Sequence, residues 1–136
     1  MGSARLIQVG LGPIGRGIVA QVAEREGMEL VGAVDLDPGK VGMDAGILSG
    51  TERLGVEVSG DLKEVLGREA DVVVLATGSR LVDVAPQVEM CVRAGKSVVS
   101  TCEELAFPFT AHPELARRID ELAEEHGVAV LGTEGG

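Results

Sequence analysis

Apolar residues in this chain fall into two patterns, short runs rich in valine, leucine and isoleucine, and longer stretches in which they recur every three or four residues. Short apolar runs are typical of parallel strands buried on both faces. Three-to-four spacing is typical of helices with one buried side. The runs predict six strands at residues 6–9, 29–34, 56–58, 72–75, 96–99 and 128–131. The spaced stretches predict helices at residues 14–25, 62–66, 83–94 and 113–126.

This alternation predicts one α/β domain over residues 1–136, built on a doubly wound sheet of six parallel strands, the Rossmann fold. The expected strand order is 3-2-1-4-5-6. Pro86 fits the helix over 83–94 only in its first turn, where a missing N–H costs nothing. Residues 36–55 are expected to form a long loop with one helical turn. Residues 1–3 and 134–136 look like linker sequence.

The two amphipathic helices with the clearest pattern give specific expectations for burial. Each should turn one apolar stripe toward the core. We expect the stripe of the first helix to be Ile14, Ile18, Val22 and Ala23, and that of the last helix to be Leu115, Ile119, Leu122 and Ala123.

The turn between the first strand and the first helix reads Gly10-Leu11-Gly12-Pro13-Ile14-Gly15, a G-x-G-x-x-G pattern. In dinucleotide-binding proteins the first glycine allows the tight turn, the second lets a pyrophosphate approach the backbone, and the third lets the helix pack against the sheet. Pro13 suits the first helical turn. The phosphates would then sit on the helix N-terminus, whose unpaired N–H groups attract anions.

Asp35 ends the second strand 20 residues after Gly15, where this pattern places an acid that binds the adenosine ribose. A carboxylate there favours NAD, because the 2′-phosphate of NADP would meet like charge. Lys40 in the same loop offsets that charge, so NADP stays open. Asp37 is the next candidate for the ribose ligand.

The loops after the fourth and fifth strands are also predicted to border the cofactor. In a doubly wound sheet, the ligand crevice lies outside the carboxyl ends of the strands. The first of these loops contains Ala76, Thr77 and Gly78, and the second begins with Ser100 and Thr101.

Composition and charge narrow the function. The formal net charge of −10 argues against nucleic acid or an anionic membrane surface as partners. No apolar run reaches 18 residues, and the two cysteines lack metal-site spacing, so we expect a cytoplasmic protein without a bound metal. The absence of tyrosine excludes the Tyr-x-x-x-Lys chemistry of short-chain dehydrogenases. His112 and His126 suit helix ends and are interpreted as structural.

Four segments together resemble the amino-terminal half of the dihydrodipicolinate reductase superfamily, and are most similar to its 2,4-diaminopentanoate dehydrogenase and amine dehydrogenase branch. They are VGLGPIGR at 9–16, VGMDAG at 41–46, ATG at 76–78 and STCEEL at 100–105. The resemblance implies an NAD(P)-dependent enzyme that interconverts amines with ketones and ammonia, or reduces imines.

By the same resemblance, the cofactor-binding residues include Ile14, Arg16 and Cys102 besides those already named, and Glu103 or Glu104 handles the proton of the amine beside the nicotinamide. Cys102 itself has no nearby histidine in the sequence and is interpreted as a small packing residue rather than a nucleophile.

Where the superfamily continues into a substrate-binding and dimerising domain, this sequence carries only residues 134–136 after Thr133. We therefore expect cofactor binding without turnover. Self-association is expected around Phe107, Phe109 and the sixth strand. Two other hypotheses remain: a non-catalytic nucleotide- or CoA-binding module, and an engineered Rossmann scaffold.

Overall fold

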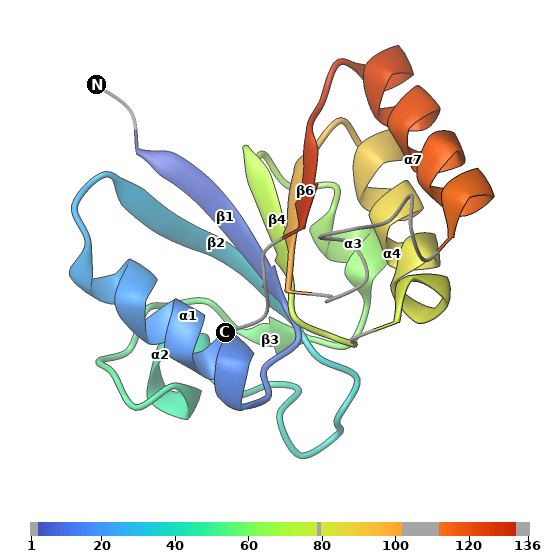
Figure 1. The fold of residues 1–136 in the computed structure, drawn as a ribbon. Helices are drawn as coiled ribbons and strands as arrows, with labels where there is room; N and C mark the ends of the chain where they lie inside the picture. The colour runs from blue at the N-terminus through green and yellow to red at the C-terminus, as the bar shows by residue number, and fades with distance from the viewer. Residues whose placement is uncertain (1–2, 79, 102–111, 133–136) are drawn as a thin grey trace.

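The computed structural model describes residues 3–78, 80–101 and 112–132. Figure 1 shows one twisted sheet with helices on both sides. The strands are β1 (Ala4–Val9), β2 (Met28–Val34), β3 (Val58–Ser59), β4 (Val72–Leu75), β5 (Ser97–Ser100) and β6 (Val130–Gly132). The helices are α1 (Pro13–Glu24), α2 (Ala45–Leu48), α3 (Leu62–Val65), α4 (Leu81–Arg93) and α7 (Pro113–His126).

All strand pairs are parallel, and the sheet order is β3-β2-β1-β4-β5-β6. This confirms the predicted doubly wound topology. The chain starts in the middle at β1, builds one half outward to β3, crosses back to β4 and builds the other half outward to β6. The carboxyl ends of β1 and β4 therefore lie side by side at the point where the strand order reverses.

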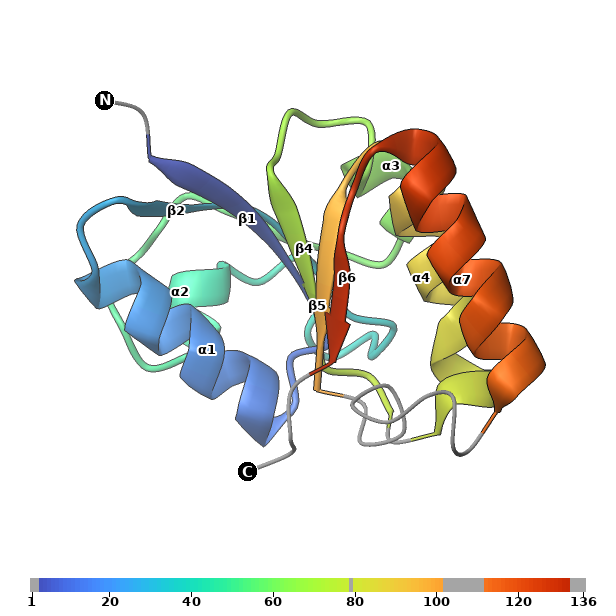
Figure 2. The same ribbon diagram turned by 45° about the horizontal axis from the view of Figure 1, so that its top comes forward.

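The two halves of the sheet carry their helices on opposite faces. In Figure 2, α1 and α2 lie on one side, and α3, α4 and α7 lie on the other. Right-handed crossovers require this, because the chain moves in opposite directions along the sheet in its two halves. Among the described residues, no helix is long and apolar enough to cross a membrane.

Two aliphatic clusters form the core, one on each face. The larger packs β1, β4 and β5 against α3, α4 and α7, and the smaller packs β1, β2 and β4 against α1 and α2. Valine, leucine and isoleucine dominate both clusters, because the sequence has only two aromatic residues, both phenylalanine. The stripe predicted for the last helix is confirmed at Ile119, Leu122 and Ala123, with Leu115 packed at its edge.

Three local predictions were wrong in detail. Helix α1 buries Gly15, Val19 and Val22, whereas Ile14 is 62% exposed. Gly15 packs against the strand, so the buried face of α1 continues from Gly15 to Val19 and Val22. Ile14 and Ala23 lie outside this face and are exposed.

The other two incorrect predictions concern the boundaries of α4 and β3. Helix α4 begins at Leu81, so Pro86 lies inside the helix rather than in its first turn. The Val82 carbonyl therefore receives no N–H from position 86. Val82 is 47% exposed. Strand β3 is only Val58–Ser59, because Val56 and Glu57 pair instead with the Asp44 loop.

Candidate functional site

The glycine turn joins three elements through backbone contacts. Gly10 has φ +94°, a left-handed conformation that side chains disfavour, and its N–H donates to the Val34 carbonyl of β2 at 2.8 Å. A Cβ at Gly10 would overlap the Ala76 carbonyl after β4, and a Cβ at Gly15 would overlap the Gly10 carbonyl. The predicted role of Gly15, close packing of helix on strand, is thus visible in the structure.

Gln8 supports this turn from below. It is fully buried in β1, and its Nε2 donates to the carbonyl oxygens of Gly10 at 3.0 Å and Val9 at 3.4 Å. Two acceptors on the same nitrogen fix which end of the amide faces the turn. Our sequence reasoning missed Gln8, although one amide inside an otherwise apolar strand, next to a glycine turn, was a usable signal.

Gly12 differs from the other two glycines of the motif. Its φ of −73° suits any residue, and a Cβ placed there would meet no atom within 4 Å. Gly12 is also the N-cap of α1 and offers that helix no side-chain cap. Open space in front of uncapped N–H groups is what an approaching pyrophosphate requires, so the residues fit the expected dinucleotide.

A cavity of about 400 Å³ opens beside this turn, at the carboxyl ends of β1, β2 and β4. Its position agrees with the crevice predicted from the doubly wound topology. The cavity brings together the glycine turn, the acid after β2 and the loop after β4. Its lining residues are Val9, Gly10, Leu11, Gly12, Val34, Asp35, Leu36, Lys40, Leu62, Ala76, Thr77, Asp83, Val84 and Gln87.

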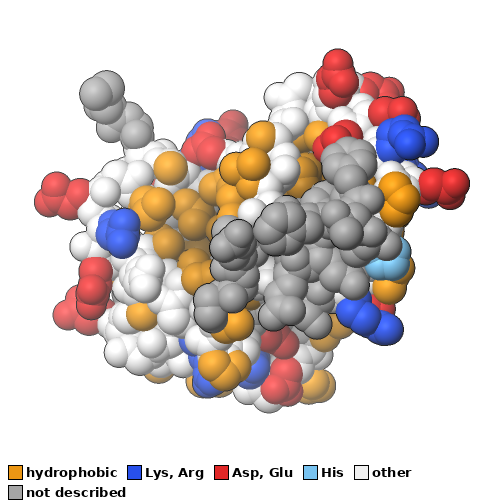
Figure 3. All heavy atoms as spheres, in the orientation of Figure 1, with side chains coloured by type: hydrophobic (Ala, Val, Ile, Leu, Met, Phe, Trp, Pro, Cys, Tyr) orange, Lys and Arg blue, Asp and Glu red, His pale blue; other side chains and the backbone are white. Residues whose placement is uncertain are grey.

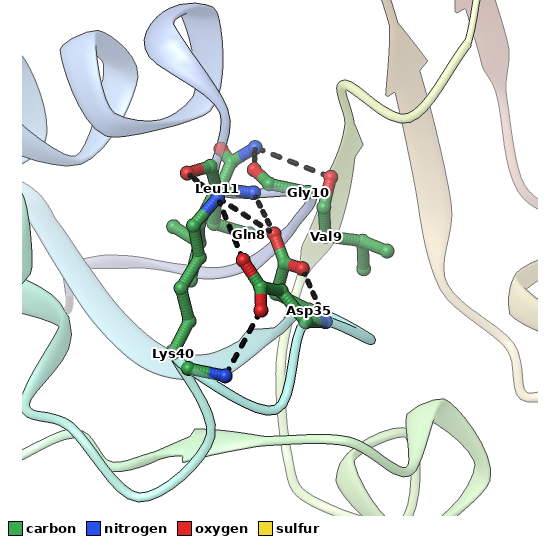
Figure 4. A network of polar contacts seen from close by, with 8 residues as sticks. Gln8, Val9, Gly10, Leu11, Asp35 and Lys40 are labelled. Carbon is green, nitrogen blue, oxygen red and sulfur yellow. Dashed lines mark hydrogen bonds and ion pairs between the residues drawn. The ribbon is translucent and has the colours of Figure 1, made fainter.

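Asp35 and Lys40 bind the two main-chain polar groups of Leu11 in the turn, as Figure 4 shows. The Asp35 Oδ2 accepts from the Leu11 N–H at 2.8 Å, and the Lys40 Nζ donates to the Leu11 carbonyl at 3.0 Å. The ammonium lies 3.8 Å from the Asp35 Oδ2 and 4.0 Å from the Asp37 Oδ2. The loop that begins after β2 is therefore fastened to the glycine turn at both ends of Leu11.

The pKa of Asp35 is lowered from its ordinary value. Burial alone would raise it, but the N–H groups of Asp37 and Leu11 and the Lys40 charge outweigh that effect. Asp35 is therefore a carboxylate at neutral pH, and its side chain is 16% exposed toward the cavity. An ionised acceptor in this position suits ribose hydroxyl groups.

The loop after β4 contributes two of its three predicted residues, Ala76 and Thr77, to the cavity lining. The Thr77 hydroxyl is 2.6 Å from the Gln87 Oε1, which lines the same cavity from α4. Gln87 was not predicted, because it lies on the next element along the chain. Gly78 is exposed and is not among the lining residues, and a Cβ placed there would lie 3.4 Å from a methyl group of Val84.

Ser100 and Thr101 follow the neighbouring strand. Ser100 is buried in register with Leu75 at the end of β5. The Thr101 N–H donates to the Leu75 carbonyl at 2.9 Å, so the segment turns off at the same edge of the sheet. Cys102, Glu103 and Glu104, like Phe107 and Phe109, lie outside the described residues.

Three further predicted positions flank the turn. Pro13 begins α1 and Ile14 follows it, both exposed, while Arg16 is partly buried and donates its N–H to the Gly12 carbonyl at 2.9 Å. Leu36, 79% exposed on the cavity wall, was not predicted. An exposed leucine directly after the acid offers an apolar surface for a flat ring.

One carboxylate organises the long loop between β2 and β3. The Asp44 side chain accepts from four backbone N–H groups, those of Ile47, Leu54, Gly55 and Val56, at 2.8–3.1 Å. Burial would raise the pKa of Asp44, but these four donors lower it. The single helical turn predicted for this loop is confirmed as α2, and Asp44 is its N-cap.

Comparison with known proteins identifies the family. The family model described as dihydrodipicolinate reductase, N-terminus, matches residues 4–130. The chain belongs to the dihydrodipicolinate reductase family. It forms the amino-terminal NAD(P)-binding domain of that family, and the glycine turn described above lies within the matched residues. Among the described residues, no cluster of three or more acidic, histidine or cysteine side chains is placed to hold a metal ion.

Individual relatives refine the comparison. The 2,4-diaminopentanoate dehydrogenase of Acetoanaerobium sticklandii is 36% identical over 98% of this chain, and a 4-hydroxy-tetrahydrodipicolinate reductase of Syntrophotalea carbinolica is 34% identical over 83%. The solved amine dehydrogenase of Mycobacterium smegmatis superimposes with a TM-score of 0.90 at 35% identity over 96% of the chain. The WlbA dehydrogenase of Bordetella pertussis, solved with NADH and UDP-GlcNAcA, gives 0.73 at 26% identity over 97% of the chain.

In each case the match is to part of a longer protein. The chain spans 38% and 39% of the two sequence relatives, and 39% and 35% of the two solved chains.

Proposed function

We propose that the chain is the cofactor half of an NAD(P)-dependent oxidoreductase that interconverts amines with ketones and ammonia, or reduces imines. The observation that carries this proposal is the extent of the match to the 2,4-diaminopentanoate dehydrogenase, 98% of the chain. The reductase relatives match 40–83% of it. The fit to the solved amine dehydrogenase supports the same choice.

The described residues provide binding and orientation. The N–H groups at the start of α1 would hold the pyrophosphate, and Asp35 would accept hydrogen bonds from the adenosine ribose. Ala76 and Thr77 form the wall beyond the turn. The nicotinamide ring, when bound, accepts or supplies the hydride. The residues at the carboxyl edge of the sheet would bind and orient that cofactor.

We propose a preference for NAD over NADP that is incomplete. Asp35 repels a 2′-phosphate, whereas the Lys40 ammonium, 3.8 Å away, attracts it. The two charges largely cancel for an incoming phosphate. Asp37, 4.0 Å from the same ammonium, adds a second negative charge, and the balance therefore favours NAD.

Proton transfer is assigned to Glu103 or Glu104, which follow Thr101 in the sequence. A carboxylate can take the proton of an amine when partial burial raises its pKa, typically a 10²–10⁴-fold effect on rate. The assignment rests on the resemblance of the segment STCEEL, residues 100–105, to the dihydrodipicolinate reductase superfamily. Changing each glutamate to Gln in an enzyme that has a substrate domain would test it, because only the catalytic one should lower kcat without changing NAD affinity.

The 136-residue chain alone is proposed to bind cofactor without turning over substrate. Holding the substrate carbon against the nicotinamide lowers the barrier by about 7–11 kcal/mol, and the groups that do so belong to the second domain in two-domain dehydrogenases. The whole enzyme is proposed to be a cytoplasmic homo-oligomer. Support comes from the dimerising domain that the resemblance implies and from the free thiol of Cys91.

A thermal-shift panel with NAD, NADP, CoA and ATP tests the binding function. A ligand at one hundred times its dissociation constant stabilises the fold by about 2.7 kcal/mol. NAD should give the largest shift, and incubation with amines should give no reduced-cofactor absorbance. A shift with CoA alone would support the non-catalytic module, and no shift with any ligand would overturn the cofactor role.

A further inference from the structure

Two polar side chains of the cavity come from α4. Asp83 and Gln87 are four residues apart on this helix, so they lie on one side of it, and both belong to the cavity lining. The same cavity includes Gly12 and Asp35, where the pyrophosphate and the adenosine ribose are proposed to bind. The base attached to that ribose is therefore the part of the cofactor that α4 is placed to contact.

Apolar side chains offer this base a surface for its flat faces. Leu36 directly follows the ribose acid and is 79% exposed, while Leu62 and Val84 line the cavity from α3 and α4. At the lower edge of the molecule, where the loop after β2 lies in Figure 1, Figure 3 shows hydrophobic side chains among charged ones. Contacts with the face of a base do not distinguish one base from another, because every base has such a face.

Thr77 fixes which end of the Gln87 amide is free. Its hydroxyl donates to the Gln87 Oε1 at 2.6 Å, and its methyl group would lie 3.0 Å from a Cβ at Gly10. An amide carries an acceptor at one end and two donors at the other. The oxygen is occupied by Thr77, and no residue in the described part of the chain accepts from the nitrogen. Gln87 therefore presents a donor to a ligand.

Asp83 supplies an acceptor on the same side of the helix. Arg80 donates to both of its carboxylate oxygens, from Nε to Oδ2 at 2.9 Å and from Nη2 to Oδ1 at 3.4 Å. Each carboxylate oxygen has two lone pairs, so Asp83 can still accept a hydrogen bond from a ligand. Neighbouring turns of α4 therefore present an acceptor and a donor to the same cavity.

We propose that Asp83 and Gln87 select adenine as the base of the cofactor, and that Thr77 is the positioning residue that fixes Gln87 for this task. Adenine carries an amino donor, N6, beside an acceptor ring nitrogen, N7. N6 donates to the Asp83 carboxylate, and N7 accepts from the Gln87 Nε2. A base with an oxygen at position 6 places an acceptor against the carboxylate and is disfavoured. The inference rests on the proposed function, which puts the adenosine ribose at Asp35.

Nicotinamide hypoxanthine dinucleotide tests the proposal, because it differs from NAD only in the base, which has an oxygen in place of the amino group at position 6. Calorimetric titration of the 136-residue chain with each dinucleotide gives the ratio of the two affinities. We expect NAD to bind about tenfold more tightly, or better. Equal affinities would overturn the proposal while leaving the cofactor role intact, because NAD would still bind. A chain that binds neither dinucleotide would overturn both.

Gln87→Met removes the donor and keeps the length of the side chain. It should lower the ratio of affinities to about threefold or less, mainly by weakening NAD binding. Gln21→Met is the matched control and should change neither affinity, because Gln21 is exposed on α1 and lies outside the cavity lining. Equal losses for the two dinucleotides in Gln87→Met would show that Gln87 only packs against the base, and would overturn its role in selection. Thermal midpoints confirm that each variant is folded before titration.

Thr77→Val keeps the shape of the side chain but frees the Gln87 amide to turn either end toward the base. The hypoxanthine dinucleotide should then bind more tightly with little change for NAD, whereas Thr77→Ser keeps the hydroxyl and should retain the parent ratio. Asp83→Asn should also strengthen binding of the hypoxanthine dinucleotide, because an amide N–H can donate to the oxygen at position 6. A loss of stability in Thr77→Val without a change of the ratio would overturn the positioning role of Thr77.

Discussion

The Asp35 carboxylate accepts a 2.8 Å hydrogen bond from the main-chain N–H of Leu11. The acid expected to bind ribose is thus also the group that fastens the glycine turn to the end of β2. Lys40 holds the carbonyl of the same leucine from the other side. Cofactor choice and turn geometry consequently depend on one small network. Substitutions in it should therefore be followed both by cofactor affinity and by the stability of the fold.

Asp35→Ser should weaken NAD binding and shift the ratio of affinities toward NADP by about tenfold, equivalent to 1.4 kcal/mol. The serine removes the repulsion of a 2′-phosphate. Asp35→Asn is the matched control, because its amide oxygen can still accept from the Leu11 N–H while the charge is lost. Calorimetry with both cofactors measures the ratio. An unchanged ratio in both variants would move discrimination to Asp37.

Lys40→Met should lower NADP affinity more than NAD affinity, in the direction opposite to Asp35→Ser. The methionine keeps the length of the side chain in this partly buried position but removes the only described cation that pairs with Asp35. We expect a fall of about tenfold for NADP and about twofold for NAD at low salt. Equal losses for both cofactors would mean that Lys40 acts only by holding the Leu11 carbonyl.

Gly12→Val and Gly15→Ala should fail in different ways. At Gly12 a Cβ would meet no protein atom within 4 Å and the backbone is ordinary, so the fold should persist while NAD binding falls at least tenfold. At Gly15 even a methyl group would overlap the Gly10 carbonyl, so the loss should appear as instability. Urea unfolding and NAD titration of both variants separate the effects; normal NAD affinity in Gly12→Val would remove the phosphate role from this turn.

Asp44→Asn should destabilise the fold by about 2 kcal/mol at pH 7, because an amide cannot replace a carboxylate that serves four N–H groups. The pKa of Asp44 is lowered in the fold, so its contribution is complete above its ordinary value of 3.8 and is lost as the pH falls through the folded pKa. The variant should therefore lose less stability than the parent between pH 5 and about pH 2.

Asp61→Asn is the control for that comparison. Asp61 caps α3 by accepting one hydrogen bond of 3.3 Å from the Glu64 N–H. The loss of stability in Asp61→Asn should therefore stay below about 1 kcal/mol. Urea unfolding at several pH values measures both variants. Equal costs for the two would show that the Asp44 network does not act as a unit.

Periodicity and glycine spacing were sufficient to predict the strand order and the position of the cavity, because both follow from alternating elements and right-handed crossovers. They were insufficient where a single contact decides the outcome. Ile14 looked like a buried residue, but the contact between Gly15 and Gly10 rotates α1 away from it. Asp35 and Lys40 lie 24 and 29 positions after Leu11 and bind its main-chain N–H and carbonyl. A sequence pattern of side chains does not predict contacts with main-chain atoms.

The backbone contact of Gly10 with Gly15 and Ala76 also has a kinetic consequence. Three elements meet there without an intervening side chain, and Gln8 holds the turn from beneath, so the turn is formed before any ligand arrives. Association with NAD then involves no ordering step within the turn. Stopped-flow mixing should accordingly give one exponential phase whose rate rises linearly with NAD concentration, and differences in affinity between cofactors should appear in the dissociation rate.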